Sequence, residues 1–167
     1  MKLVMFDAAE NGDAKDKASL RRSRRVRTKA AQIFGGPLYL RNGDVSNLYR
    51  DIVDLHEFYH EKKTSLSDVF PSLIRMALRL LCEAAAKEYQ QDIAAYVNSR
   101  FKNAKATLDQ DTKTTLSNQN VTEKSLVQLL HTGAHNYAAA ANIEQTLAVS
   151  IILGALLTDS HGKVQSN

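Results

Sequence analysis

The sequence predicts an all-α fold, a bundle of five or six helices that follows a basic arm. Apolar residues recur at helical spacing through most of the chain after residue 45. The 167 residues are 44% hydrophobic and 24% charged, which excludes wholesale disorder. Two Pro and seven Gly exclude collagen-like and Pro-rich chains, and the single Cys82 excludes a disulfide framework and a four-Cys zinc site.

The chain divides into a basic linker or arm at residues 1–29 and a helical domain at residues 30–167. Residues 1–13 show no sustained periodicity and are typical of a linker or of the end of an upstream domain. Asp16 can cap a helix that runs to Phe34, where a Gly-Gly-Pro sequence stops it.

An Asn-Gly pair lies between apolar residues in the next segment. This pattern predicts a small β-hairpin near residues 38–45. Ser46 can then cap a helix over 47–62, in which Leu48, Ile52, Leu55 and Tyr59 share one face.

Pro71, at a first-turn position, opens the next helix, which extends to about Tyr89. Its buried face is predicted to hold Leu73, Ile74, Ala77, Leu80, Leu81, Ala84 and Ala85. Asp92 starts a helix to about Leu108, with Ile93, Tyr96, Val97, Phe101 and Ala104 pointing inward. Residues 109–120 are rich in Thr, Asn and Gln and are predicted to form a mobile loop.

Thr122 can cap a short helix to about His131, and Gly133 indicates that this helix ends there. A capping box that begins at Asn142 predicts the last helix, over 143–159. That helix is apolar on most sides, so we expect it at the centre of the core or in an oligomer seam.

The most apolar stretch, 143–157, has 15 residues and contains Glu144 and Gln145. It is too short and too polar to span a bilayer, so no membrane partner is expected. The N-terminus lacks an apolar segment of signal-peptide length, and we therefore expect a cytoplasmic protein.

Charge is concentrated near the N-terminus. The stretch 15–29 carries a net charge of +7, and the rest of the chain sums to −3. Its eight cations are Lys15, Lys17, Arg21, Arg22, Arg24, Arg25, Arg27 and Lys29. Guanidinium groups fit phosphate oxygens in pairs, so this segment favours contact with DNA or RNA. No aromatic residue is interleaved with the cations, which predicts contact with the backbone and not with bases.

Few residues suggest site chemistry. His131 and His135 have a spacing that can hold a metal on one helix face, but no third ligand is evident and Gly133 separates them. We therefore predict no metal and no cofactor. His131, His135, Asn136 and Tyr137 are expected to fix the turn before the last helix and to line a small polar groove.

The segment LVQLLHTGAHNY at 126–137, followed by NIEQTLAV at 142–149, resembles the C-terminal signature of HEPN-type helical domains. In those domains a His near the start of the final helix region precedes a long apolar helix. Residues 70–81, 133–137 and 145–163 also resemble the helical region that follows a ParB/sulfiredoxin-type N-terminal domain in some bacterial proteins.

The HEPN resemblance implies a ribonuclease only where Arg precedes His by four to six intervening residues. The positions that would serve His135 hold Leu130, Leu129 and Gln128. The only matching pair is Arg50 with His56, on an early helix.

The sequence therefore predicts a non-catalytic module of a bacterial DNA-maintenance or phage-defence protein. It would bind nucleic acid through its basic arm and form a homodimer. One alternative is a metal-independent HEPN-type ribonuclease that uses His135 or the Arg50/His56 pair. Another is a purely structural interaction domain whose basic arm is only a soluble linker.

Overall fold

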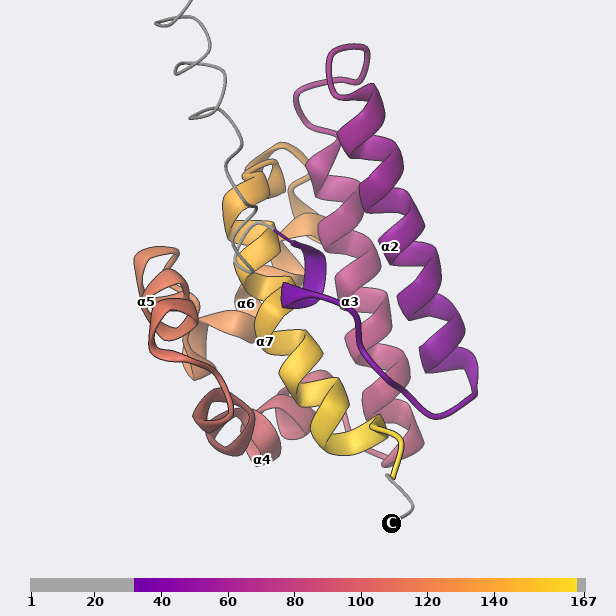
Figure 1. The fold of residues 1–167 in the computed structure, drawn as a ribbon. Coiled ribbons are helices and arrows are strands. Elements are labelled where there is room, and N and C mark those ends of the chain that lie inside the picture. Colours follow the sequence, from indigo (N-terminus) through magenta and orange to yellow (C-terminus); the bar gives the residue numbers. More distant parts are fainter. Residues whose placement is uncertain (1–31, 165–167) are drawn as a thin grey trace, which may run out of the picture.

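The computed structural model describes residues 32–164 and confirms the all-α prediction (Figure 1). The elements in chain order are the 3-10 turn η2 (Ile33–Gly35), α2 (Asp44–Lys62), α3 (Pro71–Glu88), α4 (Ile93–Ala106), α5 (Gln110–Asn118), α6 (Glu123–His135), the 3-10 turn η3 (Ala138–Ala140) and α7 (Ile143–His161).

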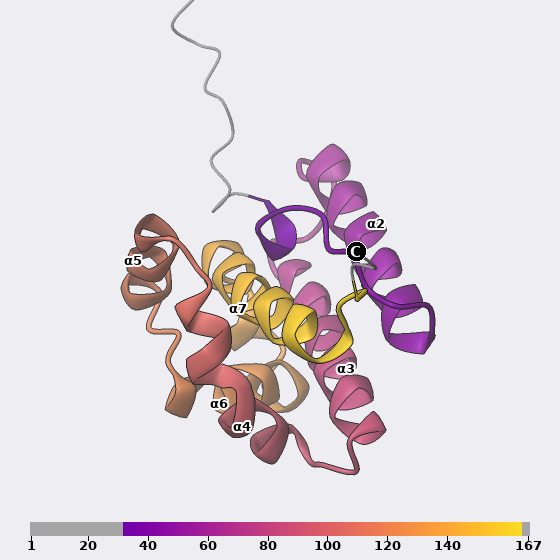
Figure 2. The same ribbon diagram turned by 60° about the horizontal axis from the view of Figure 1, so that its bottom comes forward.

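Helix α7 is the centre of the fold. It contacts η2, α3, α4 and α5, and it lies between the α2–α3 pair and the group formed by α4, α5 and α6 (Figures 1 and 2). The sequence predicted this helix either at the centre of the core or in an oligomer seam, and the structure places it at the centre of the core. By length and composition, α7 is the one helix among residues 32–164 that could cross a membrane, and 61% of its most apolar window is buried inside the domain. It is longer than predicted because it continues to His161.

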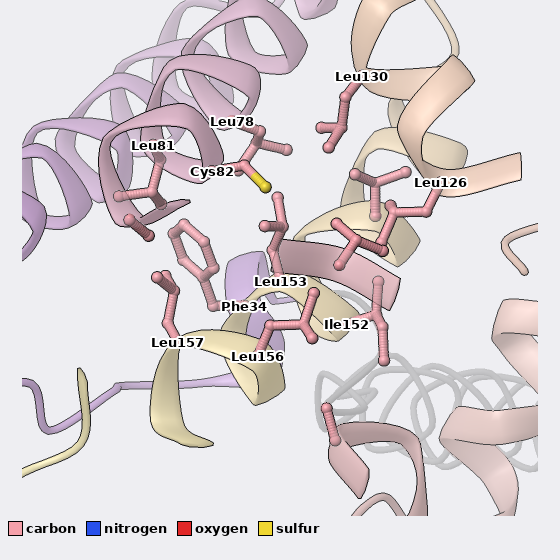
Figure 3. Packing of buried hydrophobic residues seen from close by; sticks show 14 of the residues in the cluster. Phe34, Leu78, Leu81, Cys82, Leu126, Leu130, Ile152, Leu153, Leu156 and Leu157 are labelled. Carbon is pink, nitrogen blue, oxygen red and sulfur yellow. The ribbon is translucent and has the colours of Figure 1, made fainter. Parts of the chain in front are cut away.

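The core contains side chains from η2 and from each of the helices α2 to α7. Phe34 from η2, Leu78 and Cys82 from α3, and Leu126 from α6 surround Leu153 of α7 (Figure 3). Burial of such side chains contributes roughly 1.5–3 kcal/mol each and is the main force that holds α7 in place.

The β-hairpin expected near residues 38–45 is not formed in the described chain. Leu40 instead makes an isolated antiparallel bridge with Gly162, and the Arg41 N–H donates to the carbonyl of His161 at 2.9 Å. The backbone of this segment is thus satisfied by the C-terminus of α7, and α2 begins inside the expected second arm. The cap expected at Ser46 is also wrong, because Ser46 is buried within α2 and Gly43 occupies the N-cap.

The polar stretch 109–120, expected to be a loop, contains helix α5. The Asp109 carboxylate accepts a hydrogen bond from the Thr112 N–H at 2.8 Å, which caps the helix. Leu116 is fully buried, so a single apolar anchor and a good N-cap are enough to form a short helix in this packed setting.

The buried face of α3 is rotated from the predicted one. The residues that the core covers are Ile74, Arg75, Leu78, Leu81, Cys82, Ala85 and Ala86. Leu73 and Leu80, both expected inside, are 40% and 55% exposed. The first half of the helix carries apolar residues on its outer face as well, so its apolar pattern does not by itself identify the buried side.

The turn η2 packs tightly against the middle of α7. The Phe34 N–H donates to Ser150 Oγ at 2.9 Å, and Phe34 itself is buried with φ 57°. A Cβ on Gly154 would lie 3.1 Å from the Phe34 carbonyl oxygen. Glycine at position 154 therefore permits this close approach.

Candidate functional site

The predicted nucleic-acid contacts, Lys15 to Lys29, lie outside the described residues. The described part, residues 32–164, holds 13 Lys and Arg against 14 Asp and Glu, a net charge of −1. The domain is thus close to neutral.

The two candidate histidines lie one turn apart on α6. The helix passes through Gly133 and ends at His135, so the expected end near His131 is wrong. His131 is half-buried and His135 is exposed. Within residues 32–164 no group of three His, Cys, Asp or Glu side chains is placed to hold a metal ion.

Asn136 and Tyr137 do hold the turn after α6. The Asn136 N–H donates to the Thr132 carbonyl at 2.8 Å, and Asn136 Oδ1 accepts from the Ala139 N–H at 3.4 Å. The Ser72 hydroxyl donates to the Tyr137 carbonyl, which ties the turn to the start of α3. These bonds fix the chain between α6 and α7.

His131 lines a surface hollow of about 470 Å³ between α3, α4 and α6. Its charged wall consists of Arg79, Glu83, Lys87 and Asp92. The Asp92 carboxylate is already bonded to the Ala95 N–H as the cap of α4. Two cations face two carboxylates, so this hollow has no net charge to attract an anion.

Arg50 and His56 do not converge. Six residues along α2 correspond to a rotation that leaves the two side chains about 120° apart around the helix axis. Arg50 is exposed, whereas His56 lines a separate hollow with Tyr49 and Pro37. The helix therefore turns this pair away from a common substrate.

A polar cluster lies where α3, α4 and α7 meet, and we call Tyr96, Ser160, His161 and Glu88 the His161 relay. Tyr96 OH and Ser160 Oγ are 2.7 Å apart, and Ser160 Oγ is 2.7 Å from His161 Nδ1. His161 Nε2 lies 2.8 Å from Glu88 Oε2. Since a carboxylate only accepts, Nε2 carries the proton, and the chain of donors runs from Tyr96 through Ser160 and His161 to Glu88.

Burial sets the chemistry of this relay. Desolvation lowers the pKa of His161 below its usual value, and the hydrogen bond to Glu88 only partly offsets it. Desolvation also raises the pKa of Tyr96 well above the ordinary range for tyrosine. Both groups are therefore neutral at pH 7, with His161 acting as a hydrogen-bonding bridge.

The order Ser, His, Glu invites comparison with a nucleophilic triad. Access argues against this function, because Ser160 is 9% exposed and His161 2%. The five hollows of about 250 to 510 Å³ described on the domain do not include either residue. A nucleophile needs a place for its substrate, whereas the bonds of the relay join α3, α4 and α7.

The Tyr89 ring covers His161 within the relay. The Tyr89 ring meets His161 edge-on with centroids 5.6 Å apart, and the Tyr89 hydroxyl donates to the Ser160 carbonyl. The Arg100 guanidinium lies 4.3 Å from the Tyr89 ring centre and 4.8 Å from that of Tyr96. This arrangement shields the histidine with a cation over aromatic faces.

A second buried cluster links α3 to the start of α7. Arg75 is 1% exposed. Its Nε and Nη2 donate to Thr146 Oγ1 at 3.0 and 2.9 Å. Its Nη1 donates to Gln145 Oε1 and its Nη2 to the Asn142 carbonyl, both at 3.2 Å. Every terminal nitrogen of the guanidinium is therefore used.

Cys82 is buried, and burial raises the pKa of its thiol to about 12. The thiolate fraction at neutral pH is then negligible. Cys82 is therefore an unreactive core residue.

Sequence reasoning missed both Arg75 and the His161 relay. An Arg inside an apolar run, Leu-Ile-Arg-Met-Ala-Leu, is a signal for a buried polar side chain, and so is a His at the end of an apolar helix. Neither signal names the partner, because the partners lie about 70 residues away.

Searches with protein-family models, among curated proteins and among solved structures found no significant match for this chain. The resemblance to HEPN-type domains thus stays a prediction, and the function must be argued from the residues of this chain.

Proposed function

We propose that this chain is a non-catalytic nucleic-acid-binding and oligomerisation module that contacts the phosphate backbone through Lys15–Lys29. On the family resemblance given above, it would belong to a bacterial DNA-maintenance or defence protein. The observation that carries the proposal is the segregation of charge. Residues 15–29 hold a net +7, whereas residues 32–164 hold a net −1.

A segment with this density of cations neutralises phosphates and releases counterions, so its affinity falls steeply with salt. Five of its eight cations are Arg, whose planar donors pair with two phosphate oxygens at once. The neutral domain would add little to such binding, and the basic segment would account for most of it.

The domain itself offers support for a scaffold function. Its two buried basic side chains, Arg75 and His161, are used to join helices. The candidates for a ribonuclease centre are separated, since His135 lies at the exposed end of α6 while Arg50 and His56 diverge on α2.

The test is binding to a short DNA duplex and to single-stranded RNA across a salt series, with the full chain. In the test variant Arg21, Arg22, Arg24 and Arg25 are changed to Gln. We expect affinity at low salt to fall by about tenfold or more. The salt slope should also become shallower, by up to about 0.9 for each duplex phosphate that the variant no longer neutralises.

The matched control changes four exposed cations of the domain to Gln: Lys62, Lys63, Lys102 and Lys124. It removes the same charge and should leave the salt slope almost unchanged. An equal loss in both variants would contradict a specific role for the basic segment. RNA cleavage that disappears in His135→Ala or His56→Ala would overturn the non-catalytic assignment.

A further inference from the structure

The outer face of α3 carries an apolar stripe that the domain leaves uncovered. Leu73, Met76 and Leu80 are 40%, 40% and 55% exposed. They are spaced by three and four residues, which is the spacing of a helix-pairing seam. Large apolar residues in such a row on one helix indicate an interaction surface.

A depression runs beside the stripe. It is a hollow of about 370 Å³ between α3 and α6. Its lining consists of Met76, Ala77, Arg79, Leu80, Glu83 and Ala134. An apolar side chain from outside can enter it as a knob enters a hole.

Two opposite charges border the same stripe. Arg79 and Glu83 lie one turn apart on α3, yet neither side chain makes a hydrogen bond or ion pair with another described residue. The Nε of Arg79 is buried and has no acceptor within residues 32–164. A partner that covers the stripe can supply both an acceptor for Arg79 and a cation for Glu83.

We propose that this face of α3 is a self-association surface and that its occupant is the same face of a second copy, in an antiparallel pair. When the twofold axis passes near Leu80, the two Leu80 side chains meet. Arg79 of one copy then lies within about 3 Å, along the helix axis, of Glu83 of the other. The same pairing occurs twice by symmetry.

Charge complementarity selects a second copy over a different partner. The stripe has one cation and one anion placed so that each satisfies its counterpart across a twofold axis. A partner of uniform charge would satisfy one and repel the other. This inference rests on the oligomerisation half of the proposed function, and it places the interface on α3 because α7 is buried in the core.

The experiment measures the mass of the full chain by sedimentation equilibrium over a wide concentration range. We expect a dimer, and Leu80→Asp should raise the dimer dissociation constant by about tenfold or more. Arg79→Glu and Glu83→Arg should each weaken the dimer, and the double exchange should restore it. Val164→Asp, at a side chain that is 93% exposed and outside the α3 stripe, is the matched control and should change nothing.

The charge-exchange variants keep the test decisive if Leu80→Asp alters folding, since Glu83 is exposed. The proposal is overturned if the unmodified chain is a monomer at all concentrations. It is also overturned if the chain dimerises but the double variant, with Arg79→Glu and Glu83→Arg together, does not regain the association that each single variant loses. DNA binding with its full salt slope in a monomeric Leu80→Asp variant would leave the basic segment's role intact. If the unmodified chain forms a stable dimer but its affinity for DNA does not depend on salt, nucleic-acid binding is contradicted and the α3 interface is not.

Discussion

The two ends of α7 are both tied to α3, but by different chemistry. At the first end the Arg75 guanidinium donates to Thr146, Gln145 and the Asn142 carbonyl. At the second end His161 bridges Ser160 and Glu88. The first link uses a cation and neutral acceptors, and the second uses a neutral ring and a carboxylate.

The difference determines how each end responds to pH. Burial lowers the pKa of Arg75, but a guanidinium stays protonated in proteins, so its link is insensitive to pH. Burial also lowers the pKa of His161, which begins near 6.5 in an unfolded chain. The second link is therefore the one that mild acid weakens.

The largest effect should come from breaking the first link. Arg75→Ala leaves Thr146, Gln145 and the Asn142 carbonyl without their donors in a buried site, which we expect to cost about 3 kcal/mol of unfolding free energy. Urea denaturation followed by circular dichroism measures it. Arg50→Ala, at an exposed cation of α2, is the control and should change stability by about 0.5 kcal/mol or less. A similar small change in Arg75→Ala would show that the guanidinium bonds contribute nothing.

The second prediction concerns pH. Because the folded pKa of His161 lies below that of the unfolded chain, the unfolded state binds more protons as the pH falls through about 6.5. The unfolding free energy should therefore fall with acidification in that window and be constant above it. Thermal melts at a series of pH values measure this slope. His161→Gln should lose the slope and the exposed His135→Gln should keep it, so equal slopes in the two variants would contradict the assignment to His161.

A smaller effect is expected within the His161 relay. Tyr96→Phe removes the hydroxyl that donates to Ser160 and leaves the ring packing unchanged, which should cost about 1 kcal/mol. Ser160 keeps its hydrogen bond to His161 in this variant, so the relay loses one of its bonds and retains the others. An unfolding free energy equal to that of the wild type would show that the hydroxyl is not bonded.

The smallest effect is expected at the exposed ion pair between Arg41 and Glu88, beside the C-terminal end of α7. Arg41 Nη2 lies 3.3 Å from Glu88 Oε2, but the two side chains are 53% and 42% exposed. Solvent screens such a pair, so Arg41→Gln should change the unfolding free energy by about 0.5 kcal/mol or less. If Arg41→Gln lowered the unfolding free energy more than Tyr96→Phe does, the exposed ion pair would contribute more than the buried hydrogen bond, which would contradict this prediction.

The elements that could be predicted from the sequence are those with one clear apolar face and a recognisable cap. Helix α4 begins after Asp92 as expected, and its five inward residues are all buried. The same reasoning fails for α3 because Leu73, Met76 and Leu80 place apolar residues on its outer face too, and because burial of Arg75 depends on acceptors that only the folded chain brings near. Helix α5 has a recognisable cap in Asp109 but no apolar periodicity, because Leu116 is its one buried apolar residue, and its polar composition therefore favoured a loop.

The candidate site shows the same limit. Asn136 and Tyr137 could be assigned to their turn because the interactions of Asn136 are local. Glu88 and His161 are 73 residues apart, and no local pattern connects them. The predicted contacts at Lys15–Lys29 and the resemblance to HEPN-type domains stay predictions.

The attachment of η2 has a mechanical consequence. Phe34 is bonded to Ser150 and sits against Gly154, near the midpoint of α7. Tension applied to the chain ahead of Gln32, for instance by a tethered polymer, would pull sideways on the middle of the central helix.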